Sequence, residues 1–172
     1  MKLRKYRSED AKIICKWITN EESMYEWSAD RISKYPFDAE DLDAHHQHTI
    51  KTEMFTPYTF VDENDLPTGH IAIRYPDPED ESSLRFGFVI IDPERRRKGL
   101  GGMMLAAACE YSKNILKSER ATLAVFTRNE KALRYCGLRR NNRYRTDGGN
   151  EMVGRQVILT NRRSRQERYL SA

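Results

Sequence analysis

Cysteine is scarce in this sequence, with three in 172 residues. Cys15, Cys109 and Cys136 are widely spaced and form no C-x-x-C pair. The sequence therefore has neither a disulfide framework nor the cysteine spacing of a zinc or dithiol redox site. We expect three reduced thiols, as is usual in the cytoplasm.

Long apolar runs are also missing. The longest stretch without a charged side chain, residues 99–109, is about half of the roughly 20 apolar residues that a membrane-spanning helix needs. The basic N-terminus runs directly into polar residues, without the apolar segment of a secretory signal. These absences predict a cytoplasmic protein with no membrane partner.

Glycine and proline are few, at nine and six residues, and no linker, repeat or low-complexity block divides the chain. We therefore expect one domain over residues 1–160. The net charge of +4 is unevenly placed, because residues 134–172 hold ten Arg and three acidic residues. The basic tail, residues 161–172, has few aromatic residues and no binding motif, so we expect a surface segment rather than a nucleic-acid arm.

Apolar periodicity predicts helices and strands in alternation. Ser8 is expected to cap a first helix, with Ile14, Trp17 and Ile18 on its buried face, and a second helix is expected to start near Asp38. The expected strands are residues 2–6, 58–61, 70–75, 84–91, 122–126, 142–145 and 152–159, with a short helix at 129–136.

The clearest helical pattern covers residues 99–117. In the strand before it, alternation places Leu84, Phe86, Phe88 and Ile90 on one side. The apolar stripe of the helix is expected to consist of Leu100, Met103, Met104, Ala107, Ala108, Tyr111 and Ile115.

The turn between this strand and this helix is basic and ends in glycine. The N–H groups at a helix start and the helix dipole favour an anion, and glycine lets an oxyanion approach the main chain. Arg95, Arg96, Arg97 and Lys98 add positive charge. The pattern predicts a phosphorylated cofactor, although neither G-x-x-x-x-G-K-[ST] nor G-x-G-x-x-G occurs.

Residues 96–101 read R-x-x-G-x-G and residues 129–132 read N-x-x-A. In this order of elements, the two patterns resemble the GNAT superfamily of N-acetyltransferases, over roughly residues 2–160. Residues 27–31 resemble a stretch in an uncharacterised bacterial subgroup of that superfamily.

The resemblance implies an α/β (mixed α+β) GNAT fold, with a central, mostly antiparallel sheet that is splayed at its middle strands and flanked by helices. The strand before the basic turn is expected to carry a bulge, and Gly87 is where it lacks a side chain. The resemblance also implies acetyl-CoA as co-substrate and direct transfer of the acetyl group to a primary amine in a ternary complex. The positions that it implies for cofactor binding are Val89, Ile90, Ile91, Arg96, Arg97, Lys98, Gly99, Leu100, Gly101, Gly102, Asn129 and Lys131.

The catalytic residues follow less directly. The family commonly places a proton-donating tyrosine seven residues after the Asn of N-x-x-A, where this chain has Cys136, and Tyr135 comes one residue early. We expect Tyr135 to be the general acid, with Cys136 as the alternative. For the general base, Asp92, Glu94 and a water relay all stay open.

The acceptor side is also open. Trp27 either lines an acceptor pocket or belongs to the core, and Arg31 is a second candidate for substrate binding. The acceptor is expected to be a small-molecule or peptide amine, and many members of the superfamily form dimers. The alternative function is a non-catalytic module that binds CoA, nucleic acid or an acidic partner through the basic C-terminal end.

Four histidines complete the candidates. Asp41, His45 and His48 share a helical face, but no further ligand accompanies them, so we expect a solvated polar face around His45, His46 and His48 and no metal. His70 lies in a predicted strand and is expected to be structural.

Overall fold

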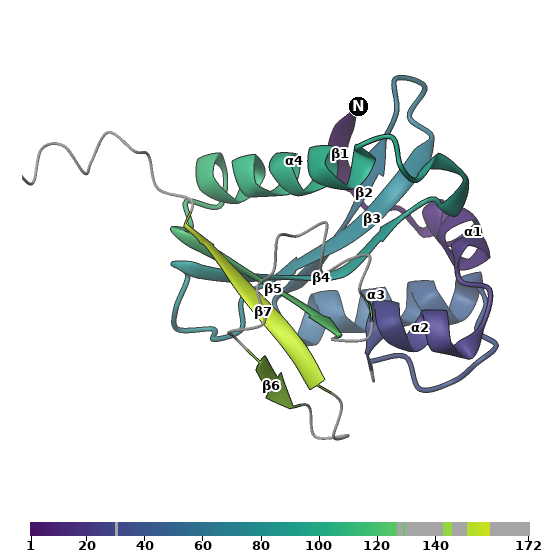
Figure 1. Ribbon diagram of the computed structural model, residues 1–172, viewed down its shortest axis with the longest axis horizontal. Coiled ribbons are helices and arrows are strands. Elements are labelled where there is room, and N and C mark those ends of the chain that lie inside the picture. Colours follow the sequence, from purple (N-terminus) through teal and green to yellow (C-terminus); the bar gives the residue numbers. More distant parts are fainter. Residues whose placement is uncertain (30, 127–128, 130–142, 146–150, 159–172) are drawn as a thin grey trace, which may run out of the picture.

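The computed structural model describes residues 1–29, 31–126 and 129, together with the backbone of residues 143–145 and 151–158 (Figure 1). The expected helix of residues 129–136 and the basic tail fall outside this part, apart from Asn129. Among the described helices, none is long and apolar enough to cross a membrane.

The described strands form one mixed sheet in the order β1-β2-β3-β4-β5-β7-β6. Neighbouring strands are antiparallel except for β4 and β5, which are parallel. This arrangement confirms the expected fold class. The strands are β1 Lys2–Lys5, β2 Phe55–Val61, β3 Pro67–Arg74, β4 Ser83–Ile91, β5 Arg120–Phe126, β6 Arg143–Arg145 and β7 Glu151–Ile158.

Helices cover both faces of the sheet (Figure 1). The helix α4 packs on one face, and α1, α2 and α3 pack on the other. Short 3-10 turns precede and follow α1, and another, η3, follows β4. The bounds are η1 Ser8–Asp10, α1 Ala11–Ile14, η2 Cys15–Trp17, α2 Glu21–Ser28, α3 Ala39–Thr52, η3 Pro93–Arg95 and α4 Leu100–Asn114.

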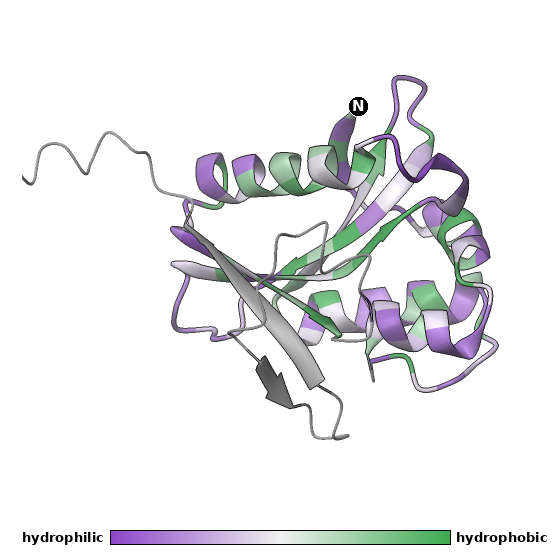
Figure 2. Ribbon diagram, in the orientation of Figure 1, coloured by the Kyte–Doolittle hydropathy of each residue, from purple (hydrophilic) through white to green (hydrophobic). Residues whose placement is uncertain are grey.

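Two apolar cores follow from these layers. Figure 2 shows hydrophobic residues along the central strands, between the two helical layers. The core under α4 contains Met104 and Ala108 of that helix against Phe60 and Ile71. The core on the opposite face contains Ile14, Trp17, Ile18, Met24, Trp27, Leu42, Phe55, Phe88 and Ile90.

Two helix predictions need correction, and a third is confirmed. Ser8 is the first residue of a 3-10 turn and not its cap, and the Arg7 amide before it donates to Asp10. Met103 lies on the solvent side of α4 and is 50% exposed, because α4 is covered on one side only, and Ile115 follows the end of the helix and is 62% exposed. The start of α3 is confirmed, since the Asp38 carboxylate accepts from the amides of Glu40 and Asp41.

The helix α2 was not predicted from the sequence. Its start carries a recognisable capping signal, in which the Ser23 amide donates to the Asn20 side chain and the Asn20 amide donates to the Ser23 hydroxyl. The helix is short, at eight residues, and two of its first residues are glutamates, so its apolar periodicity is weak. Its stability comes from packing against the sheet rather than from its own sequence pattern.

Candidate functional site

The strand β4 contains a bulge. His70 pairs with Ile90 and Ala72 pairs with Gly87, so two residues of β4, Phe88 and Val89, lie opposite Ile71. Phe88 has a φ of 51°, which is unusual for a bulky residue. The extra residue reverses the alternation after Gly87.

This reversal corrects the expectation that four apolar residues of β4 share a side. Leu84 and Phe86 pack under α4, whereas Phe88 and Ile90 pack in the core on the opposite face. The alternation of apolar residues alone predicts a regular strand, because a bulge leaves the apolar character of each position unchanged. The bulge implied by the resemblance to the GNAT superfamily is present.

Beside the bulge, β4 and β5 part. They pair only where Ser83–Phe86 face Arg120–Leu123, while β4 continues to Ile91. Within the described part of the chain, no strand pairs with this edge of β4 beyond Phe86. A Cβ added at Gly87 would meet no atom within 4 Å. The free edge of β4 can therefore pair with an extended ligand.

The helix α2 reaches both of the separated strands. The ring of Trp27 meets that of Phe88 of β4 edge to face, at 5.0 Å between centroids. The ring of Tyr25 stacks on Phe126 at the end of β5, at 5.1 Å. The missed helix is thus the element that bridges the parting of β4 and β5.

A basic turn follows the free edge of β4. Asp92 caps η3 by accepting from the Glu94 amide, and Arg97 and Gly99 then have positive φ values of 65° and 75°. These conformations lead into α4, whose first intrahelical bonds are donated to the Gly99 carbonyl by the amides of residues 102 and 103. The amides of Leu100 and Gly101 precede those bonds, so they lie at the positive end of the helix dipole.

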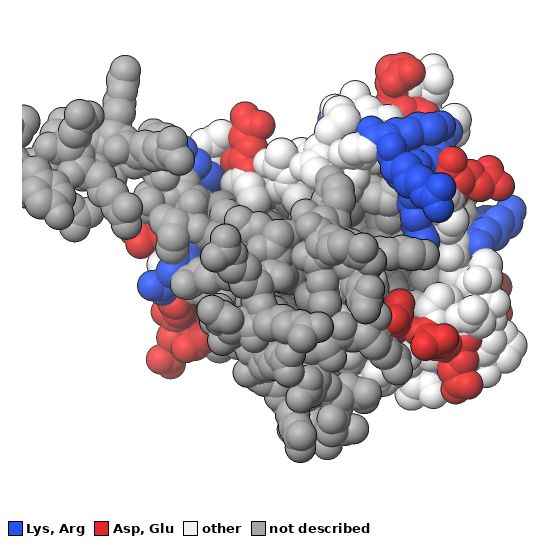
Figure 3. Space-filling view, in the orientation of Figure 1, with Lys and Arg blue, Asp and Glu red and all other residues white. Residues whose placement is uncertain are grey.

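The turn is also open to solvent. Arg96, Arg97, Lys98 and Gly99 are exposed, and a Cβ at Gly99 would meet no atom within 4 Å. Figure 3 shows Lys and Arg side chains gathered over this turn, with acidic side chains over α2 on the same face. We call residues 96–101 the anion cradle, because amides and cations converge there.

Arg95 does not join the exposed cations of the cradle. Its guanidinium donates to the Asp62 carboxylate at 2.9 Å and lies 3.6 Å from that of Asp92. The hydrogen bond from Arg95 lowers the pKa of Asp62 below its usual range. Arg95 adds positive charge beside the cradle as expected, but two carboxylates are paired with that charge.

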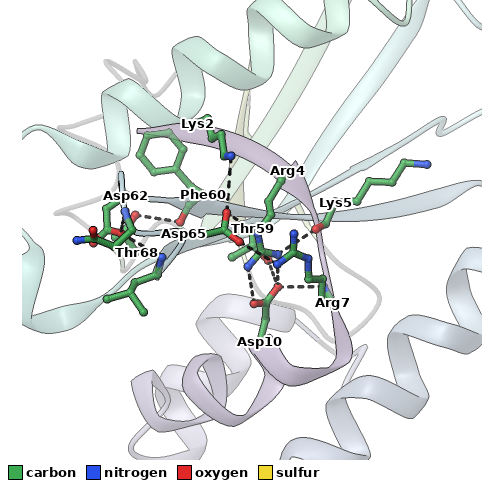
Figure 4. Close-up of polar contacts among 12 residues, drawn as sticks. Lys2, Arg4, Lys5, Arg7, Asp10, Thr59, Phe60, Asp62, Asp65 and Thr68 are labelled. Carbon is green, nitrogen blue, oxygen red and sulfur yellow. Dashed lines mark hydrogen bonds and ion pairs between the residues drawn. The ribbon is translucent and has the colours of Figure 1, made fainter.

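A second set of ion pairs lies beside the turn between β2 and β3, the turn that also contains Asp62 (Figure 4). The Arg4 guanidinium donates two hydrogen bonds to buried Asp10, at 2.7 and 2.8 Å, and a third to Asp65, at 3.3 Å. Asp10 also accepts from the Thr59 hydroxyl at 2.7 Å. These contacts join β1, the start of α1 and the β2–β3 turn.

The histidines of α3 are not a solvated face. His46 is fully buried against His70, with 3.2 Å between their Nε2 atoms, and His45 is half-buried. Only His48 is exposed, so the prediction for His45 and His46 is wrong. The structural role of His70 is consistent with its complete burial. Across the described residues, no three His, Cys, Asp or Glu side chains are grouped as metal ligands.

The other candidates lie apart. Trp27 belongs to the core, and Arg31 forms an ion pair of 2.6 Å with Glu53 just beyond α3. Of the two candidate bases, Asp92 caps η3 and Glu94 is exposed. Cys15 and Cys109 are free thiols. Lys131, Tyr135 and Cys136 lie outside the described residues.

Comparison with known proteins identifies similar chains. The family model of the acetyltransferase (GNAT) domain matches residues 1–137. A UPF0039 protein from Schizosaccharomyces pombe is 30% identical over 88 residues, which are 42% of this chain and 59% of that protein. The chain thus matches less than two thirds of the length of this curated relative.

Solved structures share the fold. Spermidine N-acetyltransferase from Vibrio cholerae in complex with CoA and spermine has a TM-score of 0.70 and 18% identity, over 91% of this chain and 94% of that one. A variant of the same enzyme has a TM-score of 0.72 and 18% identity, over 95% and 99% of the two chains.

Proposed function

Because this chain belongs to the GNAT acetyltransferase family, we propose that it is an acetyl-CoA-dependent N-acetyltransferase whose single domain spans residues 1–160. The observation that supports this most is the exposed anion cradle directly after the free edge of β4. An anionic group and an extended arm of one ligand can be held there together.

The residues present fit acetyl-CoA. The cations of the cradle and the first amides of α4 would hold its pyrophosphate. The backbone of Val89–Ile91 would pair with its pantetheine arm, as the edge of a sheet pairs with an added strand. Gly102, Asn129 and Lys131 complete the proposed cofactor site. Bound acetyl-CoA supplies the activated thioester.

Catalysis would depend mainly on positioning. An acceptor amine held beside the thioester reacts as if at high effective concentration, and a β4 amide near Val89 would polarise the carbonyl. Transfer would be direct, within a ternary complex. We propose Tyr135 as the residue that protonates the departing thiolate, with Cys136 as the alternative. A Tyr135→Phe variant with unchanged kcat would exclude Tyr135.

The acceptor that we propose is the primary amine of a cationic small molecule. The Glu26 carboxylate is half-buried and accepts from the Asn129 amide group at 3.4 Å, so it lies at the rim of the parting between β4 and β5. A carboxylate near an aromatic ring suits an alkylammonium group, and half-buried Tyr25 precedes Glu26 in α2. The similar enzyme bound to CoA and spermine supports this class of acceptor. Trp27 and Arg31 stay candidates for acceptor binding.

Two measurements test the function. Free thiol released from acetyl-CoA is followed with a panel of mono-, di- and polyamines, and thermal unfolding is followed with CoA. We expect amine-dependent thiol release and a higher Tm in CoA, because a ligand that binds the folded state stabilises it. The Lys98→Ala variant should lose most of the Tm increase, whereas Lys51→Ala on exposed α3 should keep it. An unchanged Tm at millimolar CoA would contradict the proposal.

A further inference from the structure

We propose that the β2–β3 turn, residues 62–66, is a strut that positions the anion cradle, and that Asp62 is the positioning residue which acts through Arg95. The inference rests on the proposed function for its effect on acetyl-CoA. Its structural part concerns the protein without any ligand.

One end of the turn holds η3, the segment directly before the cradle. The Asp62 side chain is 8% exposed and uses one oxygen to accept from the amides of Asn64 and Leu66. Its other oxygen accepts from Arg95, the last residue of η3. Because the turn amides fix the carboxylate, the guanidinium meets a rigid partner rather than a mobile surface side chain.

The hairpin formed by β2 and β3 also holds the start of η3, through a second contact. The Asp92 amide donates to the Thr68 carbonyl of β3 at 3.0 Å, and the Thr68 hydroxyl donates to the Phe60 carbonyl of β2 at 2.9 Å. The segment before the cradle is therefore attached to the hairpin at both of its ends, Asp92 and Arg95. The exposed residues 96–99 follow directly.

The far end of the turn is anchored to the body of the protein (Figure 4). Asp65 has a φ of 61° and forms ion pairs with Lys2, Arg4 and Arg7 at 3.8, 3.3 and 2.8 Å. Arg4 is in turn held by Asp10, whose carboxylate is buried. Alternating charges thus connect the core near α1 to η3 through the turn.

This arrangement gives Arg95 a role different from that of its neighbours. Two carboxylates neutralise its charge, so it contributes little attraction to an incoming anion. Its contribution is to fix the direction in which the chain leaves η3. The cations and amides that follow then start from a defined position, which reduces the entropy lost when a ligand binds.

The test uses Asp62→Asn, Arg95→Gln and the double variant. Asparagine keeps the acceptor for the two turn amides and removes the charge that holds Arg95. Asp80→Asn is the matched control, because Asp80 also accepts from a turn amide and pairs with an arginine, Arg120, in a turn away from the cradle. Amide hydrogen exchange is measured without ligand, and KM for acetyl-CoA, KM for the amine and kcat are measured with it.

We expect faster exchange at residues 96–101 in both single variants and no change there in Asp80→Asn. KM for acetyl-CoA should rise about tenfold, as loss of one charge-assisted hydrogen bond predicts, with kcat and the amine KM within about twofold of the unchanged chain. The double variant should be no worse than either single one, because both remove the same contact.

Exchange and acetyl-CoA KM that stay unchanged in Asp62→Asn would overturn the strut. A larger effect of Arg95→Gln than of Asp62→Asn, with additive losses, would show that Arg95 contacts the ligand itself and would also overturn it. Failure of the proposed function is a different result, in which the unaltered chain binds no CoA and releases no thiol while the exchange difference persists.

Discussion

The Nε2 atoms of His46 and His70 lie 3.2 Å apart between α3 and β3, with both side chains completely buried. A hydrogen bond between two imidazole nitrogens needs one proton, so one ring is protonated on Nε2 and the other has a bare Nε2. Burial lowers the pKa of both groups, and the neighbouring imidazole lowers that of His46 further. The pair is therefore neutral at physiological pH.

Mild acid should destabilise the protein through this pair. In the unfolded chain a histidine has a pKa near 6.5, so below about pH 6.5 the unfolded state binds more protons than the folded state. The contribution of the neutral histidine pair to the free energy of unfolding is complete above that pH and is lost as the pH falls below it. We expect a loss of about 2 kcal/mol for each histidine at pH 5, measured by urea unfolding between pH 5 and 7.

Two variants separate this effect from other titrations. The double variant His46→Leu with His70→Leu removes both imidazoles and should have a much flatter dependence on pH. His48→Gln changes an exposed histidine and should keep the dependence of the unaltered chain. A double variant that retains the full slope would show that other groups cause it.

Asp10→Ala should destabilise the fold by about 3–5 kcal/mol, because it leaves the Arg4 guanidinium, 12% exposed, without its main partner. Burial alone would raise the pKa of Asp10, but hydrogen bonds from Arg4, Thr59 and the Arg7 amide lower it overall. Its contribution is therefore present at neutral pH and lost as the pH falls through the folded pKa. Chemical denaturation measures the loss. Glu9→Ala, at an exposed neighbour, should change stability little.

Gly69→Ala should cost about 1–3 kcal/mol through overpacking. The added Cβ would lie 2.6 Å from Ile91 Cδ1, 2.8 Å from Met104 Sδ and 3.1 Å from the Ile90 carbonyl oxygen. Gly87→Ala is the contrast, because its Cβ would meet no atom within 4 Å. Equal thermal stability of the two variants would contradict the close packing of β3 against the end of β4.

Glu26→Gln should raise KM for a cationic diamine about tenfold while KM for acetyl-CoA stays the same, since it removes one charged partner of the acceptor. Glu22→Gln, an exposed glutamate on the same helix, is the control and should leave both values unchanged. Steady-state kinetics, with the diamine and acetyl-CoA varied in turn, measures the two KM values separately. An equal response of both variants would point to general surface charge instead of a specific contact.

The anion cradle shows how far local sequence can predict a site. Basic residues, glycine and a strongly periodic helix are neighbours in the chain, and the helix start they predict is where the structure has it. The backbone conformation at Gly99 also follows from the local sequence, because glycine adopts a left-handed φ without steric cost. The role of Arg95 was not predictable, because its partner Asp62 is 33 residues away.

The strands, the start of α3 and the long helix α4 were determined by sequence periodicity and capping residues, which act over a few neighbours. The bulge at Phe88, the burial of His46 and the position of α2 across two separated strands were decided by tertiary structure. Each depends on contacts between residues distant in the chain. Such contacts can bury a histidine or reverse the face of a strand without any change in the local pattern.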